Sequence, residues 1–179
     1  ILVTIGKDFH NRLIHYSIPK TKLEIGGYFR NPKLAKPLKF TSNPITKRPT
    51  ILLSCPMNHR DSVELIGKTT MAISSIKNAQ IYVNFHPMFG QDMIDDVLRD
   101  IDQNGANIHI TFVKGLASEW LKKCNVLIYN SSGTVFEAVR LGVPSIYLGP
   151  DNGLDLDKMP GGSILKCRTS EELENYGGG

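Results

Sequence analysis

From Thr50 onward, the spacing of apolar residues switches repeatedly between two patterns. Short, nearly continuous apolar runs alternate with longer segments in which apolar residues recur at helical intervals. The runs predict buried strands, and the periodic segments predict helices that bury one face. The predicted strands are 51–55, 81–85, 107–113, 126–129, 145–148 and 164–167. The predicted helices are 61–77, 93–101, 117–123, 135–141 and 170–176.

Regular alternation of strand and helix predicts an α/β fold with a mainly parallel sheet covered by helices on both faces. Ligands of such open sheets bind beyond the carboxyl ends of the strands, where loops lead into helices. This rule selects the loops that follow the predicted strands. They are Pro56–Arg60, His86–Gln91, Lys114–Leu116, Asn130–Thr134 and Gly149–Asp157.

The first part of the chain has a different composition. Ile1–Ile5 and Lys22–Ile25 read as strands on either side of a short helix, Phe9–Tyr16. Residues 32–49 are rich in proline and basic residues, which predicts a solvated linker. We therefore expect residues 1–31 to be the end of a preceding domain or an interdomain connection, 50–176 to be one ligand-binding domain and 177–179 to be a flexible glycine tail. An opening strand without an initiating Met suggests part of a longer protein.

Size, charge and cysteine content narrow the classes of protein. At 179 residues with 41% hydrophobic residues, the chain can bury one substantial core. A formal charge of +4 suits an anionic small ligand or peripheral contact of the basic linker with an acidic membrane. Nucleic acid is not expected, because no helix carries a basic stripe with interleaved aromatics. Three scattered cysteines indicate reduced thiols and a cytoplasmic protein, and no apolar stretch approaches the roughly 20 residues that span a bilayer.

A loop of small hydroxyl residues, Ser131-Ser132-Gly133-Thr134, separates the strand 126–129 from the helix 135–141. Unpaired amides at a helix start carry partial positive charge, so this loop predicts a site for a phosphate group. Glu137, one turn into the helix, would accept hydrogen bonds from ribose hydroxyls. The alternative is that Ser131 or Ser132 caps the helix and Glu137 completes a capping box, a contribution of about 1 kcal/mol.

Two further loops offer donors at the same predicted edge. His86 precedes Pro87, whose fixed backbone would hold the imidazole toward a phosphate oxygen, although a single histidine is often structural. Arg60 could clamp a diphosphate, or it could be a surface residue beside Asp61. The spacing of Asp155 and Asp157 would suit a metal ion, but helix capping is the favoured interpretation, and we predict no metal site.

These motifs together resemble a known superfamily. Phe85-His86-Pro87, the stretch Trp120–Ile128, Ser131–Ala138 and Gly142-Val143-Pro144 resemble the carboxy-terminal half of GT-B fold glycosyltransferases, of the type that builds bacterial surface polysaccharides. The resemblance implies a Rossmann-like three-layer sandwich that binds the activated donor. It also implies that His86, Ser131, Ser132 and Thr134 contact the donor phosphates and that Glu137 holds the ribose. The acceptor-binding domain and the general base would lie outside this chain.

The resulting functional hypothesis is a glycosyltransferase. It would transfer a sugar from a nucleotide-sugar substrate, without a cofactor or metal, to a surface polysaccharide or lipid-linked acceptor, in the cytoplasm or at the inner face of the membrane. One alternative is a nucleotide-sugar epimerase of the related fold, and another is a noncatalytic nucleotide- or glycan-binding module. A redox enzyme is disfavoured, because no Gly-x-Gly-x-x-Gly follows a predicted strand.

Overall fold

The computed structural model describes residues 1–4, 6–26, 49–74, 76, 78–102, 110–152, 157, 159 and 164–177. The chain divides into two compact units, residues 1–37 and 38–179. Residues 32–48 of the predicted linker and Gly178–Gly179 of the predicted tail lie outside the described residues. The predicted roles of these segments stay predictions.

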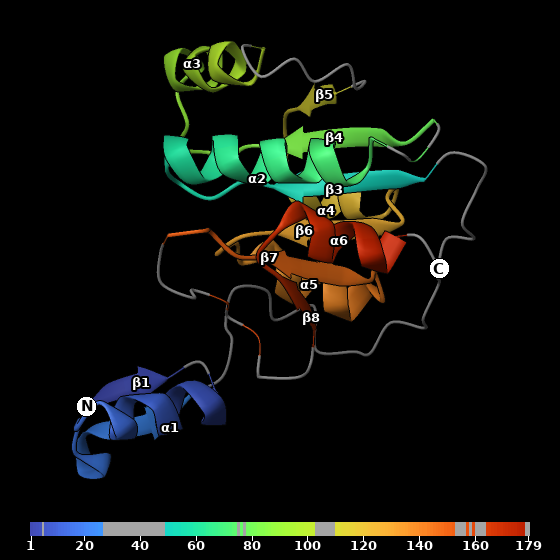
Figure 1. The fold of residues 1–179 in the computed structure, drawn as a ribbon. Coiled ribbons are helices and arrows are strands. Elements are labelled where there is room, and N and C mark those ends of the chain that lie inside the picture. Colours follow the sequence, from blue (N-terminus) through green and yellow to red (C-terminus); the bar gives the residue numbers. More distant parts are fainter. Residues whose placement is uncertain are drawn as a thin grey trace. The chain divides into compact units, whose positions relative to one another are not determined.

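The first unit contains two parallel strands joined by a helix (Figure 1). β1 (Leu2–Thr4) leads into α1 (Lys7–His15), and a short 3-10 turn, η1 (Lys20–Lys22), precedes β2 (Leu23–Ile25). Leu2 pairs with Leu23 and Thr4 with Ile25. The strand, helix and strand predicted for this segment are confirmed.

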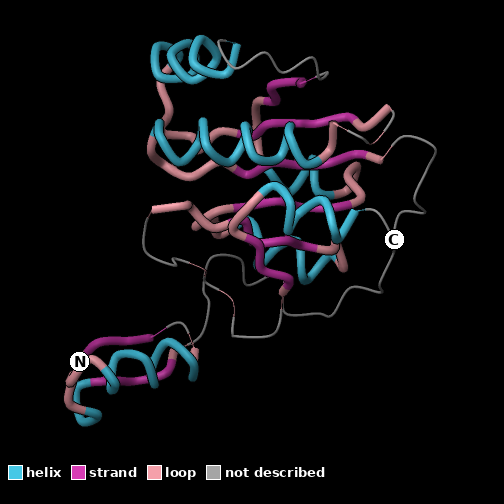
Figure 2. The backbone as a smooth tube through the Cα atoms, viewed as in Figure 1, coloured by secondary structure: helices cyan, strands magenta, loops and turns pink. Residues whose placement is uncertain are grey.

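The second unit is built on a parallel sheet of six strands (Figures 1 and 2). The spatial order is β5-β4-β3-β6-β7-β8, and every neighbouring pair is parallel. The strands are β3 (Thr50–Ser54), β4 (Gln80–Asn84), β5 (Ile110–Val113), β6 (Val126–Tyr129), β7 (Ser145–Leu148) and β8 (Leu165–Cys167). All six predicted strands are confirmed, except that residues 107–109 lie outside the described residues.

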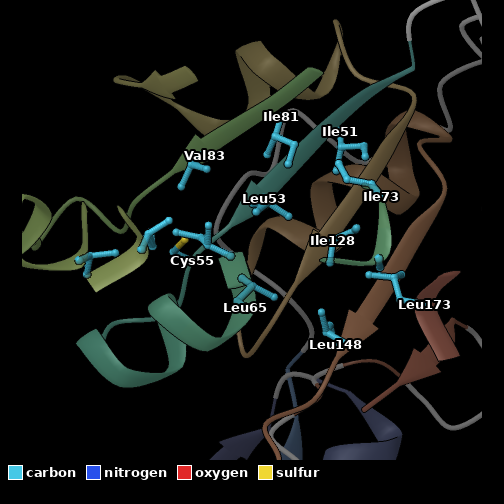
Figure 3. Close-up of a cluster of buried hydrophobic side chains, with 14 of the residues drawn as sticks. Ile51, Leu53, Cys55, Leu65, Ile73, Ile81, Val83, Ile128, Leu148 and Leu173 are labelled. Carbon is cyan, nitrogen blue, oxygen red and sulfur yellow. The ribbon is translucent and has the colours of Figure 1, made fainter. Parts of the chain in front are cut away.

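Helices cover both faces of this sheet, so the second unit has three layers (Figure 1). They are α2 (His59–Ala72), α3 (Gln91–Asp102), α4 (Ala117–Leu121), α5 (Thr134–Leu141) and α6 (Ser170–Gly177). Ile51, Leu53 and Cys55 of the β3 region face α2, α3 and α6 in one buried cluster, part of which is drawn in Figure 3. Leu52 faces the opposite cluster with α4 and α5. The alternation within β3 therefore buries both of its faces, as expected for a central strand of a parallel sheet.

Local chemistry explains where two helices begin and end. Asn58 caps α2, because its side-chain oxygen accepts from the Asp61 N–H at 2.7 Å. The helix consequently starts at His59. It ends at Ala72, whereas the sequence pattern predicted a helix over 61–77. At the end of α5, Gly142 adopts φ 71°, and the Val143 N–H donates to the Ala138 carbonyl at 2.9 Å. A left-handed glycine of this kind stops the helix and starts the turn into β7.

All three cysteines are buried and free, which confirms that they pack as small hydrophobic side chains. Among the described residues, no helix has the length and apolarity required to cross a bilayer.

Candidate functional site

The strand order places a topological switch point between β3 and β6. From β3 the chain moves outward through β4 to β5, and it then returns to β6 on the other side of β3. The connection after β3 leads to α2 on one face, and the connection after β6 leads to α5 on the other. In open α/β sheets, ligands bind where two such loops diverge.

Three hydroxyl side chains meet at this switch point, and we call them the hydroxyl cluster: Ser54, Ser132 and Thr134. Ser54 Oγ lies 2.8 Å from Ser132 Oγ and donates to Thr134 Oγ1 at 3.1 Å. Ser132 Oγ also donates to Thr134 Oγ1, at 3.0 Å, and accepts from the Thr134 N–H at 3.3 Å. The cluster therefore links the end of β3 to the first residue of α5.

The loop that carries Ser132 and Thr134 has an uncommon backbone. Ser131 has φ 48°, in the left-handed region that non-glycine residues seldom adopt. The helix then begins at Thr134 after Gly133, which occupies the N-cap position without a side-chain capping hydrogen bond. The tight turn at Ser131 brings the side chain of Ser132 back over the start of α5.

The capping alternative is confirmed for Ser132, whose hydroxyl accepts from the first amide of α5, that of Thr134, at 3.3 Å, but Glu137 completes no capping box. A capping box needs an acidic residue at the third helical position, and Glu137 is the fourth residue of α5. Its half-buried carboxylate makes no hydrogen bond or ion pair with any residue that the structure describes. Glu137 therefore lies one turn into the helix, and its carboxylate accepts from no described residue.

His86 follows β4, and its ring is fixed by the adjacent turn. The Met88 N–H donates to His86 Nδ1 at 3.2 Å, and the Phe89 N–H donates to the His86 carbonyl at 2.9 Å. Because Nδ1 is the acceptor, the neutral imidazole carries its proton on Nε2. The half-buried ring can thus donate from Nε2 to a ligand oxygen.

A pocket of about 590 Å³ opens beside His86, between α3 and the loops after β4 and β5. Its wall includes Phe85 and Phe112, whose rings stack at 5.9 Å. Lys114 and Asn84 supply polar groups at the same pocket. The pocket offers flat apolar surface and a cation next to the proposed donor histidine.

Arg60 is exposed in the first turn of α2, directly after the Asn58 cap. Neighbouring His59 is turned toward α3, with Nε2 3.2 Å from a carboxylate oxygen of Asp100. The structure places Arg60 at the ligand edge of the sheet but brings it into no contact with the hydroxyl cluster.

The candidate donors share one edge of the sheet. Ser54 pairs in register with Asn84 on β4 and with Tyr129 on β6, so the loops carrying His86 and Ser132 extend from the same end. Two strand spacings separate β4 from β6, which corresponds to about 10 Å. A diphosphate with an attached sugar is long enough to span this separation.

Sequence reasoning missed Ser54, because the run Ile-Leu-Leu-Ser-Cys reads as an uninterrupted core strand. The sequence did contain a signal for this residue. Ser54 is two positions from Leu52, so it lies on the α5 face, and it is the last residue of β3. A buried hydroxyl at the carboxyl end of a central strand indicates a polar partner in the loops above it.

Sequence reasoning also missed a group of polar contacts at the end of β6. Tyr129, the last residue of β6, donates its hydroxyl to buried Asp157 at 2.6 Å. The other oxygen of Asp157 lies 2.9 Å from Lys166 Nζ, and the Met159 N–H donates to Asp157 at 3.1 Å. Asp157 thus connects Tyr129 of β6 with Lys166 of β8. Asp155, its partner in the rejected metal interpretation, lies outside the described residues.

Cys55 follows Ser54 but cannot serve as a nucleophile. Burial raises the pKa of the Cys55 thiol to about 12, so it stays protonated at neutral pH.

No protein-family model matches the chain, and no curated protein sequence matches it. Solved structures do match. Methanocaldococcus jannaschii UDP-GlcNAc 2-epimerase, in complex with UDP-GlcNAc and UDP, is 18% identical with a TM-score of 0.64, and the match covers 97% of this chain and 52% of the epimerase. Anabaena HepE, in complex with UDP and glucose, is 12% identical with a TM-score of 0.63, covering 98% and 52%.

A structure of accessory secretory proteins 1, 2 and 3 of Streptococcus pneumoniae matches with a TM-score of 0.62 at 9% identity, over 99% of this chain and 35% of that one. The chain thus spans about half the length of HepE and of the epimerase. At these identities the likeness concerns the fold. The chain has the Rossmann-like fold of one half of a GT-B-type structure, which confirms the predicted fold class.

Proposed function

We propose that this chain is the donor-binding half of a nucleotide-sugar-dependent glycosyltransferase. The observation that carries the proposal is the hydroxyl cluster at the switch point, with the His86 donor at the same sheet edge. The GT-B-type fold and the UDP complexes of HepE and the epimerase support it.

Each candidate residue has a role in this proposal. Ser131, Ser132, Gly133 and Thr134 bind the donor phosphates through hydroxyls and the first amides of α5. Glu137 accepts from the ribose hydroxyls, and Arg60 reaches the outer side of the diphosphate. The pocket beside His86 receives a ring of the nucleotide sugar.

The reaction breaks the bond between the anomeric carbon and a phosphate oxygen and forms a bond from that carbon to an acceptor hydroxyl. Negative charge grows on the departing phosphate. The Nε2–H of His86 and the hydrogen-bond donors of the serine loop stabilise that charge, and we expect no metal ion to be required. The acceptor hydroxyl belongs to a surface polysaccharide or a lipid-linked glycan, at the inner face of the membrane, and its general base lies on another domain.

Calorimetric titration with UDP, GDP, CMP and CDP tests the binding step. We expect saturable binding of one of these nucleotides at a single site. If none binds, the proposed function fails.

The His86→Ala variant tests the chemical step in the full-length enzyme. Loss of a hydrogen bond to the developing charge costs about 3 kcal/mol, so turnover should fall on the order of 100-fold while the unfolding midpoint changes little. His15→Ala, at an exposed position of α1, is the control and should retain activity. Turnover of His86→Ala near that of wild type would remove His86 from the mechanism.

The fold match to a UDP-GlcNAc 2-epimerase favours a second candidate, a nucleotide-sugar epimerase. Incubation of the full-length enzyme with donor and water alone separates the two reactions. An epimerised sugar identifies the epimerase, whereas transfer that depends on an added acceptor identifies the transferase.

A further inference from the structure

The hydroxyl cluster contains one proton that its own hydrogen bonds do not use. Thr134 Oγ1 accepts from both Ser54 and Ser132, and it donates to neither. If one serine instead donates to the other across their 2.8 Å contact, the second serine still donates to Thr134. With Ser54 and Ser132 as the donors to Thr134, both of these arrangements end at Thr134, and no hydrogen bond from its own proton to a described residue is present.

The direction of that proton follows from the oxygen's geometry. A hydroxyl oxygen has two acceptor positions and one proton. When both acceptor positions are filled from Ser54 and Ser132, the O–H bond of Thr134 must point away from both serines. Thr134 is the first residue of α5, so this donor lies beside the first amides of the helix.

Ser54 holds this arrangement together from outside the loop. It is 3% exposed and belongs to the central strand, whereas Ser132 and Thr134 belong to a loop with a left-handed residue, Ser131. Its two contacts, 2.8 Å and 3.1 Å, connect the loop to a rigid element across the switch point. Without Ser54, Thr134 Oγ1 would lose one of its two donors, and its own hydroxyl could rotate inward.

We propose that Ser54 is a positioning residue that fixes the Ser132–Thr134 turn and thereby directs the Thr134 hydroxyl proton toward the phosphate of the ligand. This inference rests on the proposed function for the identity of the ligand. The role of Ser54 in ordering the loop is independent of any ligand.

The experiment compares Ser54→Ala and Ser54→Cys with wild type by UDP calorimetry and by native-state hydrogen exchange of the amides of residues 132–136. Cysteine fills the space of serine but is a weak donor, so it separates the hydrogen bonds from packing. Ser145→Ala is the matched control, because Ser145 lies at the start of β7 and its hydroxyl donates locally, to the carbonyl of Val143 two positions earlier, at 3.1 Å.

We expect both Ser54 variants to exchange these amides at least about fivefold faster and to bind UDP about tenfold more weakly, a cost near 1.4 kcal/mol. Ser145→Ala should change neither quantity. If wild type binds no UDP, GDP, CMP or CDP, the proposed function fails, and the exchange data still decide whether Ser54 orders the loop.

Three results would overturn the inference. Unchanged exchange in both Ser54 variants would show that the loop orders itself. Faster exchange with unchanged UDP affinity would show that the ordering does not serve the ligand. Wild-type behaviour of Ser54→Cys alone would show that Ser54 acts by filling space.

Discussion

Two polar clusters on the same sheet use their hydrogen-bonding capacity in opposite ways. Within the part of the chain that the structure describes, the hydroxyl cluster retains a spare donor at Thr134, three positions before Glu137 in α5. The lysine cluster retains no spare donor. It consists of Lys68, Glu64, Asp151 and the carbonyls of Gly149 and Arg168. Lys68 Nζ lies 2.6 Å from Glu64, 2.7 Å from Asp151, 3.1 Å from the Gly149 carbonyl and 2.6 Å from the Arg168 carbonyl.

An ammonium has three protons, so four oxygen neighbours satisfy it completely. The lysine cluster ties α2 to the chain segments that follow β7 and β8. All three protons of its ammonium group are used within the fold. In our proposal, a ligand accepts the last proton of the hydroxyl cluster, and this difference would separate a binding site from a structural network.

Lys68→Met should have a large effect on stability. The substitution keeps the apolar stem but leaves two carboxylates and two carbonyls without their cation. Because Lys68 and Glu64 are partly buried and Asp151 is exposed, we expect a cost of about 2 kcal/mol, below that of a fully buried pair. The free energy of unfolding, measured by urea denaturation, should fall by this amount. Nucleotide affinity should change less than about twofold. A variant as stable as wild type would show that solvent replaces the ammonium at no cost.

Thr134→Val should give the largest effect on binding. Valine preserves the shape but removes both the hydroxyl donor and the oxygen that accepts from Ser54 and Ser132. A hydrogen bond to a charged group contributes about 1.5–3 kcal/mol, so UDP affinity should fall about 10- to 100-fold. Stability should fall by about 1–3 kcal/mol, because a serine hydroxyl loses its acceptor. Thr69→Val is the matched control, since Thr69 donates within α2 to the Leu65 carbonyl at 2.8 Å. Equal UDP affinity in Thr134→Val and wild type would mean that the threonine hydroxyl faces no ligand.

The buried thiols form a third case, in which burial is the main influence on a polar group. Burial raises the pKa of Cys55 to about 12 and that of Cys124 to about 11, whereas thiols of the unfolded chain titrate near 9. Burial and the charge of Glu172 also raise the pKa of Cys167 to about 11. Ionisation of the thiols therefore lowers the free energy of the unfolded state as the pH rises above 9. The free energy of unfolding falls in this pH range.

This loss should amount to at most about 1.4 kcal/mol per thiol for each pH unit between the unfolded and folded pKa values. Urea unfolding midpoints at pH 8, 9.5 and 10.5 measure it, and Cys55→Ala should show a shallower decline. At pH 7.5 native Cys55 should resist iodoacetamide that labels it in urea. Equal labelling in both states would contradict its burial.

The sequence predicted the elements of the second unit well, because buried strands and amphipathic helices each have a characteristic spacing of apolar residues. Ile51 and Leu53 face one cluster while Leu52 faces the other. This alternation can be predicted without knowing which residues pack against the strand. It also placed the serine loop and His86 at the correct ends of their strands.

Contacts between side chains far apart in sequence were not predictable in the same way. Ser54 meets Thr134 80 positions away, and Tyr129 meets Asp157 28 positions away. Such pairs depend on strand order, which alternation alone does not specify. The tautomer of His86 likewise follows from a turn geometry that Pro87 restricts but does not determine.

The most direct test of the central claim is a titration of isotope-labelled protein with UDP, followed by the amide resonances of Ser132–Val135 and the ring resonances of His86. If the edge binds a diphosphate, both sets shift together and saturate at one ligand per chain, and the Thr134 amide shifts strongly. Shifts confined to other parts of the chain, or no saturable shift at all, would contradict the claim that this edge binds a nucleotide.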